Sequence, residues 1–443
     1  MGGNPDLCSL DSINVWKGKY SMHIVKRNID GYGSFAQEIP FKSIALKKYK
    51  IIGAVRTKNV KEKYAGVFVK VTDKDGNVIC RQDMGALKIN NTKDWNIYTA
   101  EFYTDETAVK IKVAGLMYGS GEAWFDNFSI EEIPLSSKIL SPNIDKYINE
   151  YFKIVRDNSL VKDTNYTNNL KINAKLLCTG DSTLAYCHSV LKNYITPKLN
   201  DGHSFFQTAM DVKEWQSGDK TTEEGLANFA IGKIIDDHIA YINVPTFVSL
   251  DSILIKKYVD SLQTIITKLD NQNPKGWIID LSNNMGGNSW AMISGLGSIL
   301  GNGTFGYSIS SNGNKMTRIY NEGWAGWDTT IMFKNTNPYH LKNTKLPIAI
   351  IYGNATASSG EVVAIAFRGM KNTKSFGQET NGSTTRIDNF ELSDGAYLNL
   401  ASGVDADRNG VLFGGRIIPD TITKDNDTAL TEGTKWIGVI NKQ

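Results

Sequence analysis

The chain has 443 residues, of which 41% are hydrophobic and 21% are charged, and its formal net charge is +3. A net charge this small argues against nucleic acid as a partner. No apolar run reaches the eighteen or so residues of a membrane-spanning helix, so no membrane span is predicted. The length allows two or three domains with separate cores. The start, MGGNPDLCSL, lacks the basic and apolar regions of a signal peptide.

Residues 1–134 predict an all-β sandwich. Short segments rich in β-branched and aromatic residues, such as GVFVKVT at 66–72, recur between turn signals. DKDGN at 73–77 predicts a hairpin turn, because Asp-Gly tolerates the positive φ that such turns require. On Trp95, Tyr98 and the closing AWFDNF, this part resembles galactose-binding-like jelly-roll modules. The resemblance implies a carbohydrate partner, with Trp95 and Trp124 as the candidate platform. Core packing is the favoured interpretation of a strand tryptophan.

After residue 134 the periodicity becomes helical. Apolar side chains at helical spacing predict a helix that buries Ile144, Tyr147, Ile148, Tyr151, Phe152 and Val155. Residues 135–200 thus predict a small helical subdomain. Residues 201–443 alternate helix-like stretches with apolar strands, among them KGWIIDLSNN and LPIAIIY. This pattern predicts a C-terminal α/β core with a mostly parallel sheet.

The four cysteines do not predict a metal site. Cys8, Cys80, Cys178 and Cys187 form no C-x-x-C pair, which makes a structural zinc site improbable. Buried free thiols are the favoured interpretation. Cys178 and Cys187 are close enough in sequence to meet within a helical hairpin. No cofactor or metal is predicted.

YGNATASSGEVVAIAF places two serines between an apolar strand and a helix. Free N–H groups at a helix N-terminus favour nearby negative charge, which suits both an alkoxide nucleophile and an oxyanion. Ser358 or Ser359 is therefore a candidate nucleophile. The alternative is a capping box, in which one serine caps the helix and Glu361 bonds back to it.

The order of residues excludes one serine-hydrolase class. All five histidines precede Ser358, whereas an α/β-hydrolase has its histidine after the serine. Among them, His203 lies in a glycine-containing turn, LNDGHSFF, where an imidazole can be exposed. A structural turn histidine is the alternative.

The stretch GWIIDLSNNMGGNSW supplies a third element. A buried strand ends at Asp280, and Gly286 and Gly287 allow the following turn to point an N–H outward, as an oxyanion donor requires. An ordinary glycine-rich turn is the alternative. A phosphate loop is not supported, because neither nucleotide-binding glycine motif is present.

DGHS, GWIIDLSNNMGGN, TASSGEVVAIAF and SDGAYLNL…GGRIIPD together resemble the S41 serine peptidases, which include the tail-specific proteases and the tricorn core. The resemblance covers about residues 140–430 and implies a ClpP/crotonase-like fold. It implies that Ser358 is the nucleophile and His203 the general base. The N–H of Ser359 and that of Gly286 or Gly287 would form the oxyanion hole.

This chain departs from the family pattern in its basic groups. Gly382-Ser383-Thr384 stands where the tail-specific branch carries its lysine, which disfavours a serine–lysine dyad despite Lys371 and Lys374 nearby. Gly202 precedes His203, where the tricorn branch has a serine. Only about thirty residues separate DGHSFF from AYINVP, too few for an inserted PDZ domain.

The group that orients His203 is not assigned by the sequence. The tricorn branch uses a distal glutamate, and the stretch directly before IIPD contains no glutamate here. The candidates are Glu379, Asp394, Asp405 and Asp407, while Glu361 is expected to be structural or to support the loop. An orienting group is needed to fix the tautomer of the histidine.

The predicted function is a serine-type peptidase that acts on a peptide or protein through an acyl-enzyme. One rival is an inactive S41 scaffold whose sandwich binds carbohydrate or protein. Another is a carbohydrate-processing enzyme, but no motif supplies the paired carboxylates that it needs. The module and the peptidase class suggest a bacterial envelope protein, periplasmic or surface-attached, or a secreted one, with its signal peptide replaced by Met-Gly-Gly.

Overall fold

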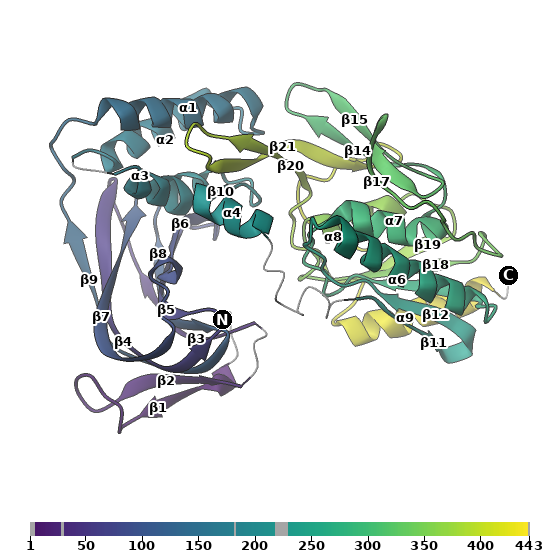
Figure 1. Ribbon diagram of the computed structural model, residues 1–443, viewed down its shortest axis with the longest axis horizontal. Coiled ribbons are helices and arrows are strands. Elements are labelled where there is room, and N and C mark those ends of the chain that lie inside the picture. The colour runs from purple at the N-terminus through teal and green to yellow at the C-terminus, as the bar shows by residue number, and fades with distance from the viewer. Residues whose placement is uncertain (1–4, 28–30, 181–182, 218–228, 442–443) are drawn as a thin grey trace. The chain divides into compact units, whose positions relative to one another are not determined.

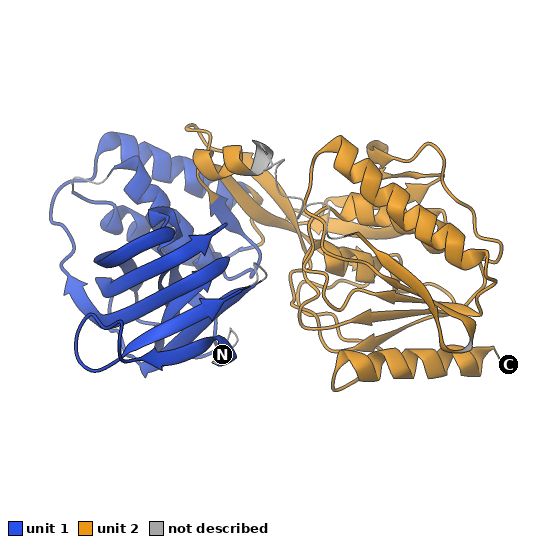
Figure 2. Cartoon of the chain, turned by 60° about the horizontal axis from the view of Figure 1, so that its bottom comes forward, with its two compact units in different colours: residues 1–157, 161–206 blue, residues 158–160, 207–443 orange. Residues whose placement is uncertain are grey.

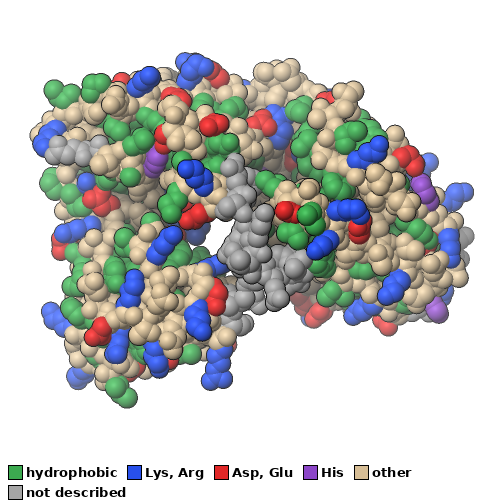
Figure 3. Space-filling view, in the orientation of Figure 1, with side chains coloured by type: hydrophobic (Ala, Val, Ile, Leu, Met, Phe, Trp, Pro, Cys, Tyr) green, Lys and Arg blue, Asp and Glu red, His purple; other side chains and the backbone are tan. Residues whose placement is uncertain are grey.

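The computed structural model describes residues 5–27, 31–180, 183–217 and 229–441. The chain divides into two compact units (Figure 2). Unit 1 comprises residues 1–157 and 161–206, and unit 2 comprises residues 158–160 and 207–443. On the face shown in Figure 3, basic and acidic side chains are interspersed, as the small net charge leads one to expect.

Unit 1 begins with two antiparallel sheets (Figure 1). The first has the strand order β1-β2-β9-β4-β7 and the second β3-β8-β5-β6. The strands are β1 (Cys8–Asp11), β2 (Ser21–Lys26), β3 (Tyr32–Pro40), β4 (Lys47–Lys61), β5 (Ala65–Thr72), β6 (Val78–Gln82), β7 (Asn91–Thr104), β8 (Lys110–Tyr118) and β9 (Ser120–Ile133). The predicted all-β N-terminal part is confirmed, and its jelly-roll topology stays a prediction.

The DKDGN turn joins β5 to β6 in an antiparallel hairpin, as predicted. Gly76 has a φ of +86°, and the Asp73 N–H donates to the Asn77 carbonyl at 3.1 Å. The Asp73 carboxylate also accepts from the N–H of Asp75 and of Asn77. Local hydrogen bonds and one permissive residue therefore determine this turn.

Of the two tryptophans considered as a sugar platform, Trp124 is only 4% exposed. Its ring stacks on His23 at 4.3 Å between centroids, and its indole N–H donates to Asp11 at 2.7 Å. Trp124 is therefore a packing residue. Trp95 is half-buried and lies 6.2 Å from the exposed ring of Trp16. A carbohydrate role stays a prediction and depends on Trp95.

The helices of unit 1 follow the sheets: α1 (Pro142–Asn158), α2 (Thr164–Leu177) and α3 (Leu184–Val190), with a short π-helical turn at Leu191–Ile195. All six apolar residues predicted to line α1 are buried. Lys198, after the last turn, forms a buried ion pair with Asp105 after β7. Tyr194 also donates to Asp105, at 2.9 Å. Helices and sheets of unit 1 thus share one interior, and the domain boundaries at 134 and 200 stay predictions.

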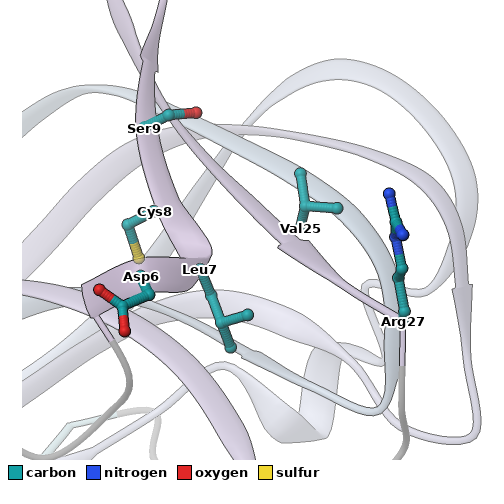
Figure 4. A pocket seen from close by; sticks show the side chains of 6 residues that line it. All are labelled: Asp6, Leu7, Cys8, Ser9, Val25 and Arg27. Carbon is teal, nitrogen blue, oxygen red and sulfur yellow. The ribbon is translucent and has the colours of Figure 1, made fainter.

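All four cysteines are free thiols. Cys80, Cys178 and Cys187 are buried, which confirms the favoured interpretation for these three. A hydrogen bond with the Cys187 thiol, together with burial, raises the pKa of Cys178. Cys8 is half-buried, and burial raises the pKa of its thiol. Cys8 lines a pocket with Asp6, Leu7, Ser9, Val25 and Arg27 (Figure 4).

Unit 2 contains the predicted, mostly parallel sheet, in the order β11-β12-β13-β18-β19-β22. Its strands are β11 (Ile231–Ile235), β12 (Ile239–Asn243), β13 (Gly276–Asp280), β18 (Ile348–Tyr352), β19 (Thr373–Gly377) and β22 (Thr421–Ile422). All neighbours are parallel except β11, which pairs antiparallel with β12. The α/β core is confirmed.

Helices cover both faces of this sheet (Figure 1). They are α6 (Ser252–Asp270), α7 (Ser289–Leu300), α8 (Ser359–Phe367) and α9 (Asn426–Ile440). Ile279 and Ile350 pack with α6, α7 and α8, whereas Ile278 and Ile351 pack with α9. Adjacent residues of a strand point to opposite faces, so strands buried on both sides are apolar throughout.

A second, antiparallel sheet of unit 2 runs in the order β21-β14-β15-β16-β17, with β20 paired to β21. Its strands are β14 (Gly303–Ser310), β15 (Lys315–Asn321), β16 (Trp324–Trp327), β17 (Thr330–Lys334), β20 (Thr385–Glu391) and β21 (Tyr397–Asp407). β10 (Phe205–Gln207) and α4 (Ala209–Ser217) precede the α/β core. None of the helices within the described ranges is long and apolar enough to cross a membrane.

Candidate active site

Ser358 lies at the end of the turn between β18 and α8, at the carboxyl edge of the parallel sheet. The Thr356 hydroxyl locks this turn: it donates to the Leu281 carbonyl at 2.8 Å and accepts from the Gly353 N–H at 3.0 Å. Ser358 has φ +51° and ψ −118°, a conformation that costs a residue with a side chain about 1–3 kcal/mol. The predicted nucleophile is thus a strained residue, fixed by its surroundings.

Behind Ser358 lies Glu361, whose side chain is fully buried. Its carboxylate accepts a hydrogen bond from the Ser358 N–H at 2.9 Å. Burial raises the pKa of this carboxyl above its ordinary value, although its hydrogen bonds act in the opposite direction. Glu361 therefore holds the backbone of the candidate nucleophile. With Ser358 as the N-cap of α8, it forms the capping box that the sequence offered as the alternative.

The two serines differ in what their hydroxyls do. The Ser359 hydroxyl donates to the Gly287 carbonyl at 2.7 Å. As the first residue of α8, Ser359 also has an N–H without an acceptor inside the helix. Its side chain thus has a structural partner, while its N–H is oriented as an anion donor. Of the two serines, only Ser358 has a positive φ, and this conformation supports it as the candidate for attack.

The Gly286–Gly287 turn follows β13 and lies against the Ser358 turn. Both glycines have positive φ, +102° and +114°. A Cβ on Gly286 would lie 3.0 Å from the Ser358 Cβ and 3.0 Å from the Ser359 nitrogen. The Gly286 N–H donates to the Asn284 side chain at 2.9 Å. Gly287 is therefore the stronger of the two candidate oxyanion donors.

Replacement of Gly287 by alanine is expected to disrupt this turn. The new Cβ would lie 2.0 Å from the Phe247 carbonyl, at a φ that side chains rarely adopt. We expect kcat for peptide hydrolysis to fall by about 10²–10³-fold, as on loss of one oxyanion donor. Gly301→Ala is the control, because Gly301 also has positive φ but open space around it. A Gly287→Ala enzyme with wild-type kcat would exclude this oxyanion hole.

Asn284 joins the two turns, and the sequence analysis missed it. This fully buried side chain donates to the Val244 and Pro245 carbonyls at 3.0 and 3.2 Å. The backbone carbonyl of Asn284 accepts from the Ala357 N–H at 3.0 Å. The only signal in the sequence was an Asn-Asn pair before two glycines. Asparagine favours turns generally, so this signal does not identify a buried residue that hydrogen-bonds to several segments.

His203 lies in unit 1, in a turn that Asp201 organises. The Asp201 carboxylate accepts from the N–H groups of His203 and Ser204, at 3.0 and 2.7 Å. Gly202 has a φ of +68°. The half-buried imidazole is thus presented by an ordered turn. Because Ser358 belongs to unit 2, the Ser358–His203 pair stays a prediction.

Three of the other four histidines have identifiable neighbours. His23 lies 3.1 Å from Glu122, His188 lies 3.2 Å from the Tyr147 hydroxyl, and the exposed His340 lies 3.6 Å from Glu322. These contacts are typical of structural or surface histidines.

The candidate orienting acids have different surroundings. Asp405 is fully buried and forms an ion pair with Arg318 at 2.7 Å. Asp407 accepts from two N–H groups of its own turn, at 2.9 and 3.0 Å. Glu379 is half exposed, 3.9 Å from Arg416, and Asp394 is half-buried between β20 and β21. Asp394 also accepts from the Ala396 N–H of its own turn, at 3.2 Å. Asp405 and Asp407 are buried, whereas Glu379 and Asp394 are accessible and remain the candidates.

The loop at 380–384 carries no lysine. Its Gly382 and Ser383 N–H groups donate to the Glu361 carboxylate, at 2.9 and 2.8 Å. Lys374 instead places its ammonium 5.5 Å from the centre of the Phe376 ring. Within the described ranges, no group of three or more His, Cys, Asp or Glu residues could hold a metal ion.

Comparison with known proteins identifies the class that this site defines. Residues 238–423 match the model of peptidase family S41. The nisin-resistance protein of Lactococcus lactis subsp. lactis is 30% identical over 242 residues, which cover 53% of this chain and 72% of that protein. A lipoprotein from Streptococcus agalactiae has a solved structure that is 29% identical, with a TM-score of 0.52; the match covers 69% of this chain and 99% of that one.

The photosystem II D1 C-terminal processing protease has a solved structure that is 15% identical, with a TM-score of 0.46, and the match covers 67% of this chain and 98% of that one. The chain belongs to peptidase family S41. This confirms the resemblance drawn from its motifs and supports a peptidase.

Proposed function

We propose that this chain is a serine-type peptidase in which Ser358 is the nucleophile. The observation that carries the proposal is the strained Ser358 at the start of α8, packed against the Gly286–Gly287 turn. Strain of this kind is concentrated at functional sites, where the surrounding structure maintains it. Ser358 is also the N-cap of α8. A serine that only capped the helix would not need a positive φ, because capping residues are ordinarily extended.

In the proposed mechanism, His203 accepts the proton of the Ser358 hydroxyl while its oxygen attacks the scissile carbonyl. The N–H groups of Ser359 and Gly287 donate to the oxyanion of the tetrahedral intermediate. The intermediate collapses to an acyl-enzyme as His203 protonates the leaving amine. Water, deprotonated by the same histidine, then releases the acyl group. The residue that orients His203 is Glu379 or Asp394 in this scheme.

The direct test is labelling of the full chain with a fluorophosphonate, followed by identification of the modified residue by mass spectrometry. We expect one phosphonylated residue, Ser358. No labelling, or labelling elsewhere, would contradict the proposal. Absence of labelling combined with carbohydrate or protein binding would instead support the inactive-scaffold alternative.

An apolar surface flanks the proposed nucleophile and bears on substrate choice. Met285, beside Gly286, is 69% exposed, and Val248, beside the bridge from Phe247 to Gly287, is 65% exposed. Leu250 and Ile253 continue the surface at 58% and 64%. We infer that it binds apolar side chains of a peptide substrate. One relative is named for resistance to nisin, so nisin is the first peptide to assay.

Met285→Asp is expected to raise KM for an apolar peptide by about 10-fold or more and to change kcat little, since apolar contacts contribute about 1–3 kcal/mol. Val439→Asp is the matched control. Val439 is 55% exposed on α9, which packs on the opposite face of the sheet. An unchanged KM for Met285→Asp would show that substrate does not occupy this surface.

A bacterial envelope or secreted location remains part of the proposal, supported by the description of one relative as a lipoprotein. A carbohydrate partner for the N-terminal sheets is proposed on the half-buried Trp95 beside Trp16. Quenching of tryptophan fluorescence by cell-wall polysaccharide, absent in Trp95→Ala, would test it.

A further inference from the structure

The Glu361 carboxylate is the meeting point of two chain segments. Its Oε2 accepts from the Ser358 N–H at 2.9 Å and from the Ser383 N–H at 2.8 Å. Its Oε1 accepts from the Gly382 N–H at 2.9 Å and from the Thr380 hydroxyl. Both oxygens are thus fully used, by three N–H groups that can only donate and by one hydroxyl. The nucleophile turn and the loop at 380–383 are held by one side chain.

That loop is itself anchored, so it cannot simply follow Glu361. The Thr380 N–H donates to the Ile417 carbonyl at 3.2 Å, and the Ile417 N–H donates to the Thr380 hydroxyl at 2.8 Å. The Asn381 N–H donates to the Thr356 carbonyl at 2.9 Å. The loop therefore forms a frame with fixed N–H directions on one side of Glu361.

Three N–H groups and one hydroxyl around a fully buried carboxyl satisfy its ionised form best. An amide would direct a hydrogen toward at least one donor N–H, and a protonated carboxyl would have to donate to the Thr380 hydroxyl. Among the described residues, no hydrogen-bond partner of Glu361 is a cation. The charge is thus balanced by N–H and O–H dipoles and by the N-terminus of α8. Burial of a charge in this way is costly unless the geometry is maintained.

We propose that Glu361 is a positioning residue for the nucleophile. It holds the Ser358 backbone at positive φ, so that the hydroxyl faces the scissile carbonyl while the Ser359 N–H faces the oxyanion. This inference rests on the proposed function, since it assigns a role in the same site. Because the role is exerted through Ser358, its loss affects the chemical step more than substrate binding.

The test compares Glu361→Gln and Glu361→Ala with wild type in the full chain. We expect kcat and the rate of fluorophosphonate labelling to fall by about 10-fold for Gln and about 100-fold for Ala, with KM changed by less than about threefold, because displacement of a reacting group by about 1 Å costs on this scale. Glu391→Gln, an exposed glutamate on β20, is the control. Wild-type kcat in a folded Glu361→Ala enzyme would overturn the proposal.

Thr380→Val provides a second variant in case Glu361 variants fail to fold. It removes one of the four donors and keeps the shape of the side chain, so we expect a smaller fall in kcat. Thr380→Ser, which restores the hydroxyl, should recover it. A merely stabilising residue would lower the melting temperature without separating kcat from KM. If Thr380→Val leaves kcat unchanged, the frame does not position the nucleophile.

Amide hydrogen exchange at Ser358 and Ser383 separates this inference from the proposed function. We expect both amides to exchange faster in Glu361→Gln, because each loses its charged acceptor. Faster exchange in a chain that fluorophosphonate does not label would support the positioning role of Glu361 and contradict the proposed peptidase function. Unchanged exchange would reject the positioning, whatever the activity.

Discussion

Replacing Ser358 by alanine is expected to abolish fluorophosphonate labelling and to lower kcat for peptide hydrolysis by about 10⁴-fold or more. The variant lacks the attacking oxygen, while the Gly286–Gly287 turn and the Ser359 N–H remain. Residual turnover would reflect water attack assisted by the oxyanion hole. Ser359→Ala, which loses only the bond to the Gly287 carbonyl, should still be labelled at Ser358. Equal loss of labelling in both variants would contradict the assignment.

The same position tests the backbone strain. Ser358→Gly is expected to be inactive and yet more stable than Ser358→Ala by about 1 kcal/mol. Relief of about 1–3 kcal/mol of strain exceeds the entropic cost of glycine, about 0.5–1 kcal/mol. At Ser359, inside α8, the order should reverse, because glycine is unfavourable in helices. Urea unfolding of the glycine and alanine variants at both positions measures these differences in stability. Equal stability of Ser358→Gly and Ser358→Ala would show that the backbone is relaxed.

The second large effect is expected in unit 1. Lys198→Met leaves Asp105 buried without its cation, and removal of one partner from a buried pair costs about 3–5 kcal/mol. The side chains of Lys198 and Asp105 are only 9% and 2% exposed. Chemical unfolding should therefore show a large loss of stability. Lys153→Met, whose pair with Asp157 lies at the surface, should change stability little.

The pH dependence of stability should change sign in Lys198→Met. Burial raises the pKa of Asp105, but Lys198 and the hydrogen bonds of Thr107 outweigh this and leave it below its ordinary value. A lowered native pKa stabilises the fold above the unfolded pKa of about 3.9, and this stability is lost as pH falls through the native value. Without Lys198, burial leaves the native pKa raised, so stability should increase as pH falls toward it. Unfolding curves between pH 7 and pH 3 test this.

Periodicity predicted most of the fold because it depends on local pattern. The apolar residues of α1, the DKDGN hairpin and the strands that precede both active-site turns follow from spacing and turn chemistry. That those turns lie together follows from the rule that carboxyl ends of parallel strands share an edge. The position of every histidine ahead of Ser358 is likewise sufficient to exclude an α/β-hydrolase.

What sequence could not supply is the set of long-range polar contacts. The partners of Asn284 lie about 40 and about 70 residues away in the sequence, and the loop partners of Glu361 lie about 20 residues away. No local pattern distinguishes these two residues from ordinary turn and capping residues. The positive φ of Ser358 is likewise imposed by its surroundings. For Trp124 the favoured interpretation, core packing, agrees with its burial, but an aromatic residue on a strand fits a binding platform as well until its burial is known.

The hydrogen-bonded residues behind Ser358 and the exposed apolar surface beside it differ in how freely they can change during evolution. Asn284 and Glu361 have several fixed partners each, so a substitution there disrupts several bonds together and offers few viable intermediates. Met285, Val248 and Leu250 are exposed and can vary singly at little cost to folding. Descendants of such a protein can therefore diversify in the peptides they accept while their chemistry stays the same.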